Sequence, residues 1–280
     1  MGQAGNRLTR RLGARSLIGV AICLLRDVRA GYSSGRLAQE QPMRCHLNTL
    51  DPRSGRQLTA GDESPISDPL ADLDAFAEVA FLRRRLKRGE TVFHAGDPFS
   101  AIYAVRSGFF KTAKADAARR EQVMGFFMRG ELFGLDGVAA SRYDNTASAL
   151  EDSEIVVLPF ALMEDMAQKN RAMQRQLHAI LSREITRDHG VMMLLGTMSA
   201  EARLATFLVN LSTRFARRGY STSEFVLRMT REELGSYLGL KLETVSRLFS
   251  KFQKNGLLEV QQKHVRILDP QGLQRARAPL

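Results

Sequence analysis

The chain has few of the residues that build disulfide frameworks or metal sites. Its 280 residues include two cysteines, Cys23 and Cys45, and five histidines. Two cysteines are too few for a disulfide framework, and the histidines are scattered without the spacing of a zinc site. We therefore expect the protein to need no cofactor and no structural metal.

Long hydrophobic runs and catalytic motifs are also missing. No apolar run approaches 18 residues, so we expect a cytoplasmic protein with no membrane partner. No nucleophile elbow, Walker loop or paired-carboxylate motif is present, so we expect a protein that is not an enzyme.

Residues 16–25 resemble part of an export signal, but Arg26 and Asp27 follow at once without a clear cleavage site. The alternatives to an export signal are a disordered tail, or a stretch that precedes the true start of the protein at Met43.

Positive charge is concentrated at the two ends of the chain. Residues 1–60 hold ten arginines and three acidic residues, for a net charge of +7. Residues 197–280 hold fourteen Lys or Arg and seven Asp or Glu, also +7, so residues 61–196 carry −3 of the total +11. A basic C-terminal part beside an acidic middle is typical of a nucleic-acid-binding domain joined to a domain that does not contact nucleic acid.

Residues 230–254 predict two short helices around a tight turn. Thr230 and Glu233 have the spacing of a capping box, which marks the start of a helix. That helix would bury Leu234 and Leu238, and Gly239 would form the turn. The second helix runs on from about residue 241 with an apolar stripe at i, i+3, i+4 and i+7: Val245, Leu248, Phe249 and Phe252.

The opposite face of this second helix carries side chains that can read DNA. Arginine can bond bidentately to guanine and glutamate can accept a hydrogen bond from cytosine, while serine can do either. The residues on this face are Glu243, Ser246, Arg247, Ser250 and Lys251. An ordinary amphipathic helix with a solvated charged face is the alternative, because lookalikes of this motif are common.

The segment Glu243-x-x-Ser246-Arg247 resembles the recognition helix of the Crp/Fnr transcription regulators, in the form of the Fnr branch. Residues 198–220 resemble the same branch, and the similarity covers about residues 70–270. It implies an α+β fold with a cyclic-nucleotide-binding-like β-roll, a long dimerisation helix and a C-terminal winged helix-turn-helix. One departure is Lys241, because relatives usually place Thr or Ser there as the helix N-cap.

The resemblance and the composition together divide the chain. We expect a disordered tail at 1–64, the β-roll at 65–168, the dimerisation helix at 169–196, the Crp-type winged helix-turn-helix domain at 197–271 and a C-terminal tail at 272–280. Within the roll, strands on both sides of Ser107-Gly108 predict a hairpin. Within the last domain, residues 258–260 and 265–268 predict the hairpin of the wing.

The resemblance also implies roles for individual residues. A homodimer would read a double-stranded palindrome like TTGAT-N4-ATCAA near promoters of respiratory or low-oxygen genes, with bases read by Glu243, Ser246 and Arg247. Phosphate contacts are expected from Thr230, Arg231, Lys241, Thr244, Ser250, Lys251, Lys263 and His264. The loop Lys114–Arg120 lies where relatives touch RNA polymerase; a plain hairpin tip is the alternative.

The long helix predicts a coiled-coil seam in which residues alternate at steps of four and three. The expected seam residues are Leu177, Leu181, Glu184, Asp188, Val191 and Leu195. Packing onto the helix's own domain is the alternative. In a parallel dimer, Asp188 would approach its own copy, where like charges repel.

Two kinds of sensing known in the family do not fit this sequence. A [4Fe–4S] cluster needs four thiolates, and Val157 stands where the family's fourth cysteine would be. Cyclic-nucleotide binders of the family use an Arg for the cyclic phosphate, and here Asn145 takes its place, which removes the ion pair. A regulator of the same family that senses a small molecule or haem and controls an unrelated set of genes is the alternative, but no ligand set for it is evident.

Overall fold

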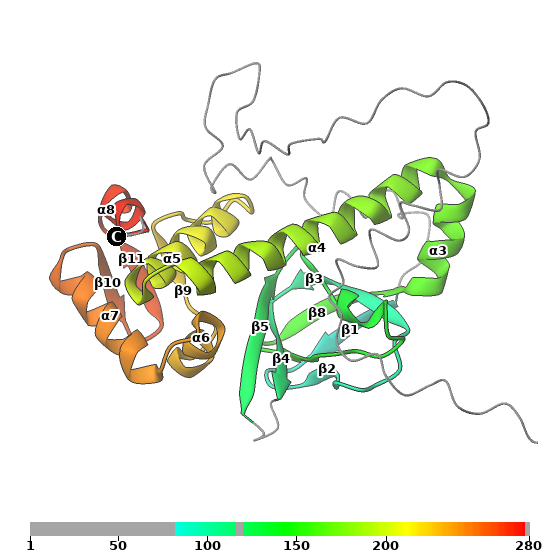
Figure 1. Cartoon of the computed structure of the whole chain (residues 1–280), viewed down its shortest axis with the longest axis horizontal. Coiled ribbons are helices and arrows are strands. Elements are labelled where there is room, and N and C mark those ends of the chain that lie inside the picture. Colours follow the sequence, from blue (N-terminus) through cyan, green and yellow to red (C-terminus); the bar gives the residue numbers. More distant parts are fainter. Residues whose placement is uncertain (1–81, 116–119, 278–280) are drawn as a thin grey trace, which may run out of the picture. The chain divides into compact units, whose positions relative to one another are not determined.

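A computed structural model of the chain describes residues 82–115 and 120–277 (Figure 1). The expected tail at 1–64, the start of the roll, both cysteines and the last three residues lie outside the described residues. Two groups of elements follow one another along the chain. Strands β1 to β8 come first, in cyan to green, and the helical C-terminal part follows in yellow to red (Figure 1).

The first group is a β-roll of two four-stranded sheets. Their strand orders are β1-β8-β3-β6 and β2-β7-β4-β5, with antiparallel neighbours. The bounds are β1 Leu82–Leu86, β2 Thr91–Phe93, β3 Ala101–Ser107, β4 Phe109–Ala115, β5 Glu121–Met128, β6 Leu132–Phe133, β7 Thr146–Ala149 and β8 Ser153–Pro159. A 3₁₀ turn, η2, spans Leu135–Gly137.

Aromatic rings fill the interior of the roll. Phe93 stacks on Tyr143 with ring centroids 3.8 Å apart, and Tyr103 stacks on Phe133 at 5.4 Å. The Tyr143 hydroxyl is buried and donates to the carbonyl of Ala101 at 2.7 Å, so its polar atom is satisfied. The inward faces of the two sheets therefore meet through packed rings, which form the hydrophobic core of the roll.

The hairpin expected around Ser107-Gly108 is wrong. Strands β3 and β4 flank this turn but lie in different sheets, because β3 pairs with β6 and β8 while β4 pairs with β5 and β7. Gly108 has φ 88°, and a Cβ there would lie 2.0 Å from the Ser153 hydroxyl oxygen. The same hydroxyl accepts from the amide of Phe109 at 3.2 Å. A corner that needs glycine thus carries the chain from one sheet to the other.

Two helices follow the roll. Helix α3 spans Phe160–Lys169 and α4 spans Arg171–Thr197, which agrees with the long helix expected from about residue 170. The Asn170 side chain caps α4 by accepting from the amide of Ala172 at 2.8 Å. None of the helices in the described part of the chain combines the length and the apolar character needed to cross a bilayer.

The C-terminal part is a winged helix-turn-helix. Its elements are α5 Ala200–Ala216, β9 Glu224–Val226, α6 Arg231–Leu238, α7 Leu242–Lys254, β10 Leu258–Gln261, β11 His264–Ile267 and α8 Pro270–Arg275. Strands β10 and β11 form the expected hairpin, and β9 adds a third strand beside β11. Helix α8 runs across the boundary expected at residue 271, into the stretch expected as a tail.

Candidate nucleic-acid interface

Helix α6 begins and ends as its sequence indicates. The Thr230 hydroxyl accepts from the amide of Glu233 at 3.1 Å, and the Glu233 carboxylate accepts from the amide of Thr230 at 2.7 Å, which confirms the capping box. Gly239 ends the helix with φ 64°. A Cβ on Gly235 would lie 2.6 Å from the carbonyl oxygen of Leu240, so glycine lets the turn fold tightly against α6.

Helix α7 separates a buried face from an exposed one. Val245, Phe249 and Phe252 are buried and Leu248 is partly buried, as the apolar spacing predicts. The three side chains expected to read bases, Glu243, Ser246 and Arg247, are all exposed on the other face. Within the described residues, the Arg247 guanidinium has one polar contact, at 3.5 Å from the Thr244 hydroxyl oxygen. This side chain is therefore free to reach a base edge.

The first turn of α7 lacks a side-chain cap. Lys241 occupies the N-cap position with an extended backbone, and its side chain makes no capping hydrogen bond. This confirms the sequence-based expectation that the departure from Thr or Ser removes the cap. Lys241 is exposed, and its charge is available to an external anion.

Arg231 is less accessible than its place in the expected phosphate-contacting set suggests. Its guanidinium lies over the ring of Phe249, with Cζ 3.4 Å from the ring centroid. Burial lowers the pKa of Arg231 to about 10, so the group stays charged at neutral pH. Its Nη1 is buried and has no hydrogen-bond partner among the described residues. A phosphate would have to be met by the other guanidinium nitrogen atoms.

Three other candidates for phosphate contact already have partners. The Ser250 hydroxyl donates to the carbonyl of Ser246 at 3.2 Å, which leaves its oxygen free to accept. Lys251 forms an ion pair with Glu201 of α5. Thr230 uses its hydroxyl oxygen in the capping box but keeps its proton for donation.

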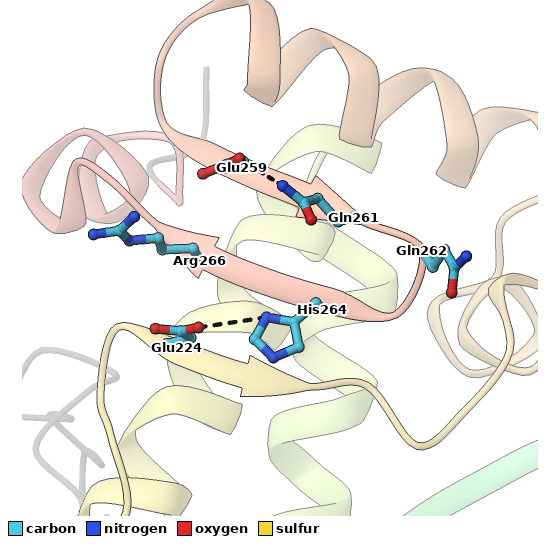
Figure 2. A pocket seen from close by; sticks show the side chains of 6 residues that line it. All are labelled: Glu224, Glu259, Gln261, Gln262, His264 and Arg266. Atoms are coloured by element: carbon cyan, nitrogen blue, oxygen red, sulfur yellow. Dashed lines mark hydrogen bonds and ion pairs between the residues drawn. The ribbon is translucent and has the colours of Figure 1, made fainter.

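The wing bears an open hollow of about 610 Å³ on its sheet (Figure 2). Its lining residues are Glu224, Glu259, Gln261, Gln262, His264 and Arg266. Figure 2 shows His264 beside Glu224, with Nδ1 3.6 Å from the carboxylate oxygen. Lys263, at the turn of the hairpin, donates to the carbonyl of Arg228 at 3.3 Å. Two carboxylates make the hollow a poor surface for phosphate, so a contact from this hairpin is better supplied by Lys263 than by His264.

Polar contacts between the roll and α6 hold this helix in place, and no pattern in the sequence indicates them. The Ser236 hydroxyl on α6 accepts from the amide of Val123 at 2.8 Å and donates to the carbonyl of Glu121 at 2.9 Å. Lys111 on β4 pairs with Glu233 at 3.1 Å and with Glu121 at 2.8 Å. Burial alone would lower the pKa of Lys111, but the two carboxylates outweigh it and the pKa is raised.

A second link joins the roll to α5. Glu131 pairs with Arg214 and, at 2.7 Å, with Arg218. Burial works to raise the pKa of the Glu131 carboxyl, but the two guanidinium groups outweigh it and the pKa is lowered. Arg214 also donates to the carbonyl of Phe126 at 2.8 Å. The helix-turn-helix is therefore tied to the roll by polar contacts from both α5 and α6.

In the roll, Asp136 lies beside Asn145, the residue expected where the family's cyclic-nucleotide binders carry an arginine. One carboxylate oxygen of Asp136 accepts from the amides of Asp144 and Asn145, at 2.9 and 2.8 Å, and from the Asn145 side chain at 2.9 Å. A negative side chain thus occupies these donors. This arrangement disfavours a phosphate at the same place.

Helix α4 turns part of the expected seam toward its own domain. Leu177 is buried in the cluster formed with α3 and the roll, and Leu195 packs against the core of the helix-turn-helix. Glu184 and Val191 are partly exposed, Leu181 packs partly against the α3 cluster, and Asp188 is exposed. The large apolar residues that α4 exposes are Ile185, Met192 and Met193, at 57%, 67% and 59%. Leu177 is therefore a core residue, because the same helix also covers the roll.

Comparisons with known proteins agree with this architecture. Residues 83–170 match the cyclic nucleotide-binding domain and residues 202–276 match the Crp-like helix-turn-helix domain. The chain is 44% identical to the transcriptional regulatory protein btr of Bordetella pertussis, over 75% of this chain and 87% of the relative. It is 46% identical to the transcriptional activator protein FnrA of Stutzerimonas stutzeri, over 75% of this chain and 86% of the relative.

A solved structure and a further relative extend the match. The structure of FixK2 from Bradyrhizobium japonicum superposes with a TM-score of 0.67 at 26% identity, over 72% of this chain and 100% of that one. The fumarate and nitrate reduction regulatory protein of Escherichia coli is 39% identical over 70% of this chain and 78% of its own. With both domains matched and relatives of this similarity, the chain belongs to the Crp/Fnr family of transcriptional regulators.

Proposed function

We propose that the protein is a homodimeric regulator that binds a TTGAT-N4-ATCAA-like palindrome and controls respiratory or low-oxygen genes. The observation that carries this proposal is the exposed face of α7, where Glu243, Ser246 and Arg247 stand clear of the buried stripe. These three side chains read the base edges in the major groove. The genes concerned are inferred from relatives named as FnrA and as a fumarate and nitrate reduction regulator.

Contacts with the DNA backbone set the position of α7 in the groove. Lys241, Thr244 and Lys263 are the candidates whose surroundings suit this role best, and Thr230 and Lys251 contribute from their edges of the motif. Ser250 contributes once its proton turns from the carbonyl of Ser246 to the phosphate. Arg231 and His264 contribute less, since one is packed on Phe249 and the other faces Glu224. Such contacts add affinity without sequence preference.

The dimer forms through the exposed face of α4. Two recognition helices must lie about 34–36 Å apart to enter successive major grooves, and a parallel pair of long helices can hold that spacing. The face offered to the partner is built from the exposed or partly exposed residues His178, Leu181, Ile185, Asp188, Met192 and Leu195. They repeat at alternating steps of three and four, which is the spacing of a coiled-coil seam.

The remaining assignments follow from this function. The segment Lys114–Arg120, of which residues 116–119 lie outside the described residues, contacts RNA polymerase, and alanine replacements there should reduce transcription without changing DNA affinity. Segment 1–64 acts as a tail, and 65–168 and 169–196 act as roll and dimerisation helix. The DNA-binding domain begins at 197 and includes α8, past the boundary expected at 271, because Leu273 is buried in its core. Because promoters are its targets, the protein works in the cytoplasm.

A titration with three duplexes tests the proposal. Fluorescence anisotropy at fixed salt would compare the TTGAT-N4-ATCAA duplex, a scrambled duplex, and a duplex whose spacer is two base pairs longer. We expect the first to bind at least about a hundredfold tighter than the scrambled duplex. The lengthened spacer should lose most of this preference, because it moves one half-site away from the second recognition helix. Equal affinity for all three duplexes would contradict the proposal.

A further inference from the structure

Two neighbouring side chains on the exposed face of α4, an acid and a histidine, have no partner among the described residues. Asp188 and His189 are both exposed, and neither makes a hydrogen bond or an ion pair with any described residue. They lie between Ile185 and Met192, whose side chains are 57% and 67% exposed. An acid and a histidine are thus placed inside an apolar stripe that no described residue of the same chain covers.

The spacing of the stripe fixes what each residue would meet in a parallel pair of α4 helices. With Ile185 and Met192 at heptad position a, Asp188 is at position d and His189 is at position e. A d side chain inserts into a hole formed by four residues of the facing helix, and one of these is the e residue. The hole that receives Asp188 is therefore formed by the partner subunit's Ile185, Asp188, His189 and Met192.

We propose that Asp188 of each protomer pairs with His189 of the partner subunit, so that dimer formation takes up protons and strengthens as the pH falls. The inference rests on the proposed α4 dimer and adds that pH controls the strength of this dimer. Without the histidine, the two Asp188 carboxylates repel each other across the axis. With both histidines charged, the two acids and the two cations alternate in one layer of the seam.

Other charged groups around this turn of α4 are engaged elsewhere. Glu184 pairs with Arg187 at 3.3 Å, and Arg187 also lies over the ring of Phe127, with Cζ 4.3 Å from its centroid. From the roll, Glu131 is held by Arg214 and Arg218, and Asp136 by the amides of Asp144 and Asn145. Tyr237 of α6 also lies near Asp188 and Arg187, and burial raises the pKa of its hydroxyl, so it stays neutral. Arg183, on the same helix, also has an interaction of its own. Among the described residues, His189 is left as the titratable group that can balance Asp188.

The direction of the pH effect follows from proton linkage. Histidine loses its charge between about pH 5 and 8, so the pair weakens as the pH rises through this range. The dimer therefore holds more protons than two monomers near neutral pH. His178 works in the opposite sense, because it lies at position a one heptad earlier and its charged form would meet its own copy.

Sedimentation equilibrium of the full chain tests the pairing. All proteins would carry His178→Gln, to remove the opposing titration, and would be compared at about pH 6 and about pH 8. We expect the parent to dimerise about tenfold more tightly at the lower pH, as two partly exposed ion pairs allow. His189→Gln should be weak at both pH values, and Asp188→Ala should be at least as strong at pH 8 as the parent at pH 6. Both variants should lose the pH dependence.

The two substitutions thus share a flat pH profile but differ in level, which a merely structural role would not produce. A parent with equal dimer affinity at both pH values, or a His189→Gln variant that keeps the pH dependence, would overturn the pairing. Ile185→Glu separates this failure from that of the dimer itself. If Ile185→Glu leaves the dimer intact, the α4 interface is wrong and the pairing falls with it. If Ile185→Glu breaks a dimer that shows no pH dependence, the α4 interface stands and the pairing alone is wrong.

Discussion

The Ser236 hydroxyl on α6 accepts a hydrogen bond from the amide of Val123 and donates one to the carbonyl of Glu121, at 2.8 and 2.9 Å. One side chain of the helix-turn-helix thus completes two backbone groups of β5. These bonds fix α6, and through the turn at Gly239 they fix the recognition helix that follows it. The orientation of the reading surface is therefore set in part by the roll.

Ser236→Ala should loosen this attachment. It leaves a backbone amide and a carbonyl of β5 without their partner, which costs about 1–2 kcal/mol. We expect a lower midpoint of thermal unfolding and a weaker affinity for the palindrome. Thr222→Ala, at an exposed side chain of the same domain, is the matched control and should change neither quantity. An unchanged midpoint in Ser236→Ala would mean that the two bonds contribute nothing to stability.

Arg247→Ala should remove sequence preference while leaving the fold intact. A bidentate base contact is worth about 1–3 kcal/mol per half-site, and a dimer has two half-sites. Because Arg247 is exposed, the unfolding midpoint should not change. Lys254→Ala, an exposed position at the C-terminal end of α7, should keep the preference for the palindrome over a scrambled duplex. Gel-shift titration at fixed salt measures both, and equal specificity in Arg247→Ala would reject this helix as the reader.

Much of the helix-turn-helix could be predicted because its signals are local. The capping box of Thr230 and Glu233, the glycine turn at Gly239 and the apolar spacing of α7 each depend on residues within one or two helical turns. By contrast, Glu131 and Arg214 are 83 residues apart in the chain, and no pattern in the sequence predicts their ion pair. The corner at Gly108 has the sequence pattern of a hairpin, because two strands adjacent in the chain have the same pattern whether or not they share a sheet.

The dimer face is a second part of the molecule that the sequence alone does not assign. Helix α4 has apolar residues for two neighbours, its own roll and a partner, and a single repeat of 3.5 residues cannot assign each stripe. Leu177 and Ile185 both fit a heptad pattern. Only their burial separates them, because Leu177 is 9% exposed while Ile185 is 57% exposed.

Glu131→Gln should destabilise the protein at neutral pH by about 2 kcal/mol, because it leaves two partly buried guanidinium groups without their carboxylate. The pKa of Glu131 is lowered in the folded protein, so its contribution is present above the pKa of an unfolded glutamate, about 4.3. That contribution is lost as the pH falls through the folded-state value. Urea unfolding at a series of pH values should show the two proteins converging in acid. A constant difference down to low pH would contradict the assignment.

Cyclic AMP should not bind the roll. The Asp136 carboxylate already accepts three hydrogen bonds beside Asn145, and it would repel a phosphate. Millimolar nucleotide should shift neither the unfolding midpoint nor the affinity for the palindrome. Asp136→Ala should lower the midpoint, since it leaves three donors without an acceptor, at about 1–2 kcal/mol. Saturable heat on titration with cyclic AMP would show that the acid does not block the site.

Air should not change DNA binding. With two cysteines in the chain, one subunit cannot supply the four thiolates of a [4Fe–4S] cluster. Protein purified without oxygen should contain no acid-labile sulfide, and its affinity for the palindrome should be equal before and after exposure to air. Stoichiometric iron and sulfide would instead indicate a cluster shared between subunits through Cys23 and Cys45.

The position of β5 at the end of its sheet has a consequence for any shortened form of the protein. An edge strand with unpaired amides and carbonyls invites another strand to add to it, and α6 covers part of this edge through Ser236. Removing the helix-turn-helix would uncover that edge together with Val123, Phe126 and Met128, which pack against the core of the DNA-binding part. A roll isolated by proteolysis would therefore tend to aggregate through β5. By covering β5, the DNA-binding domain thus also prevents the β-roll from associating with other copies of itself.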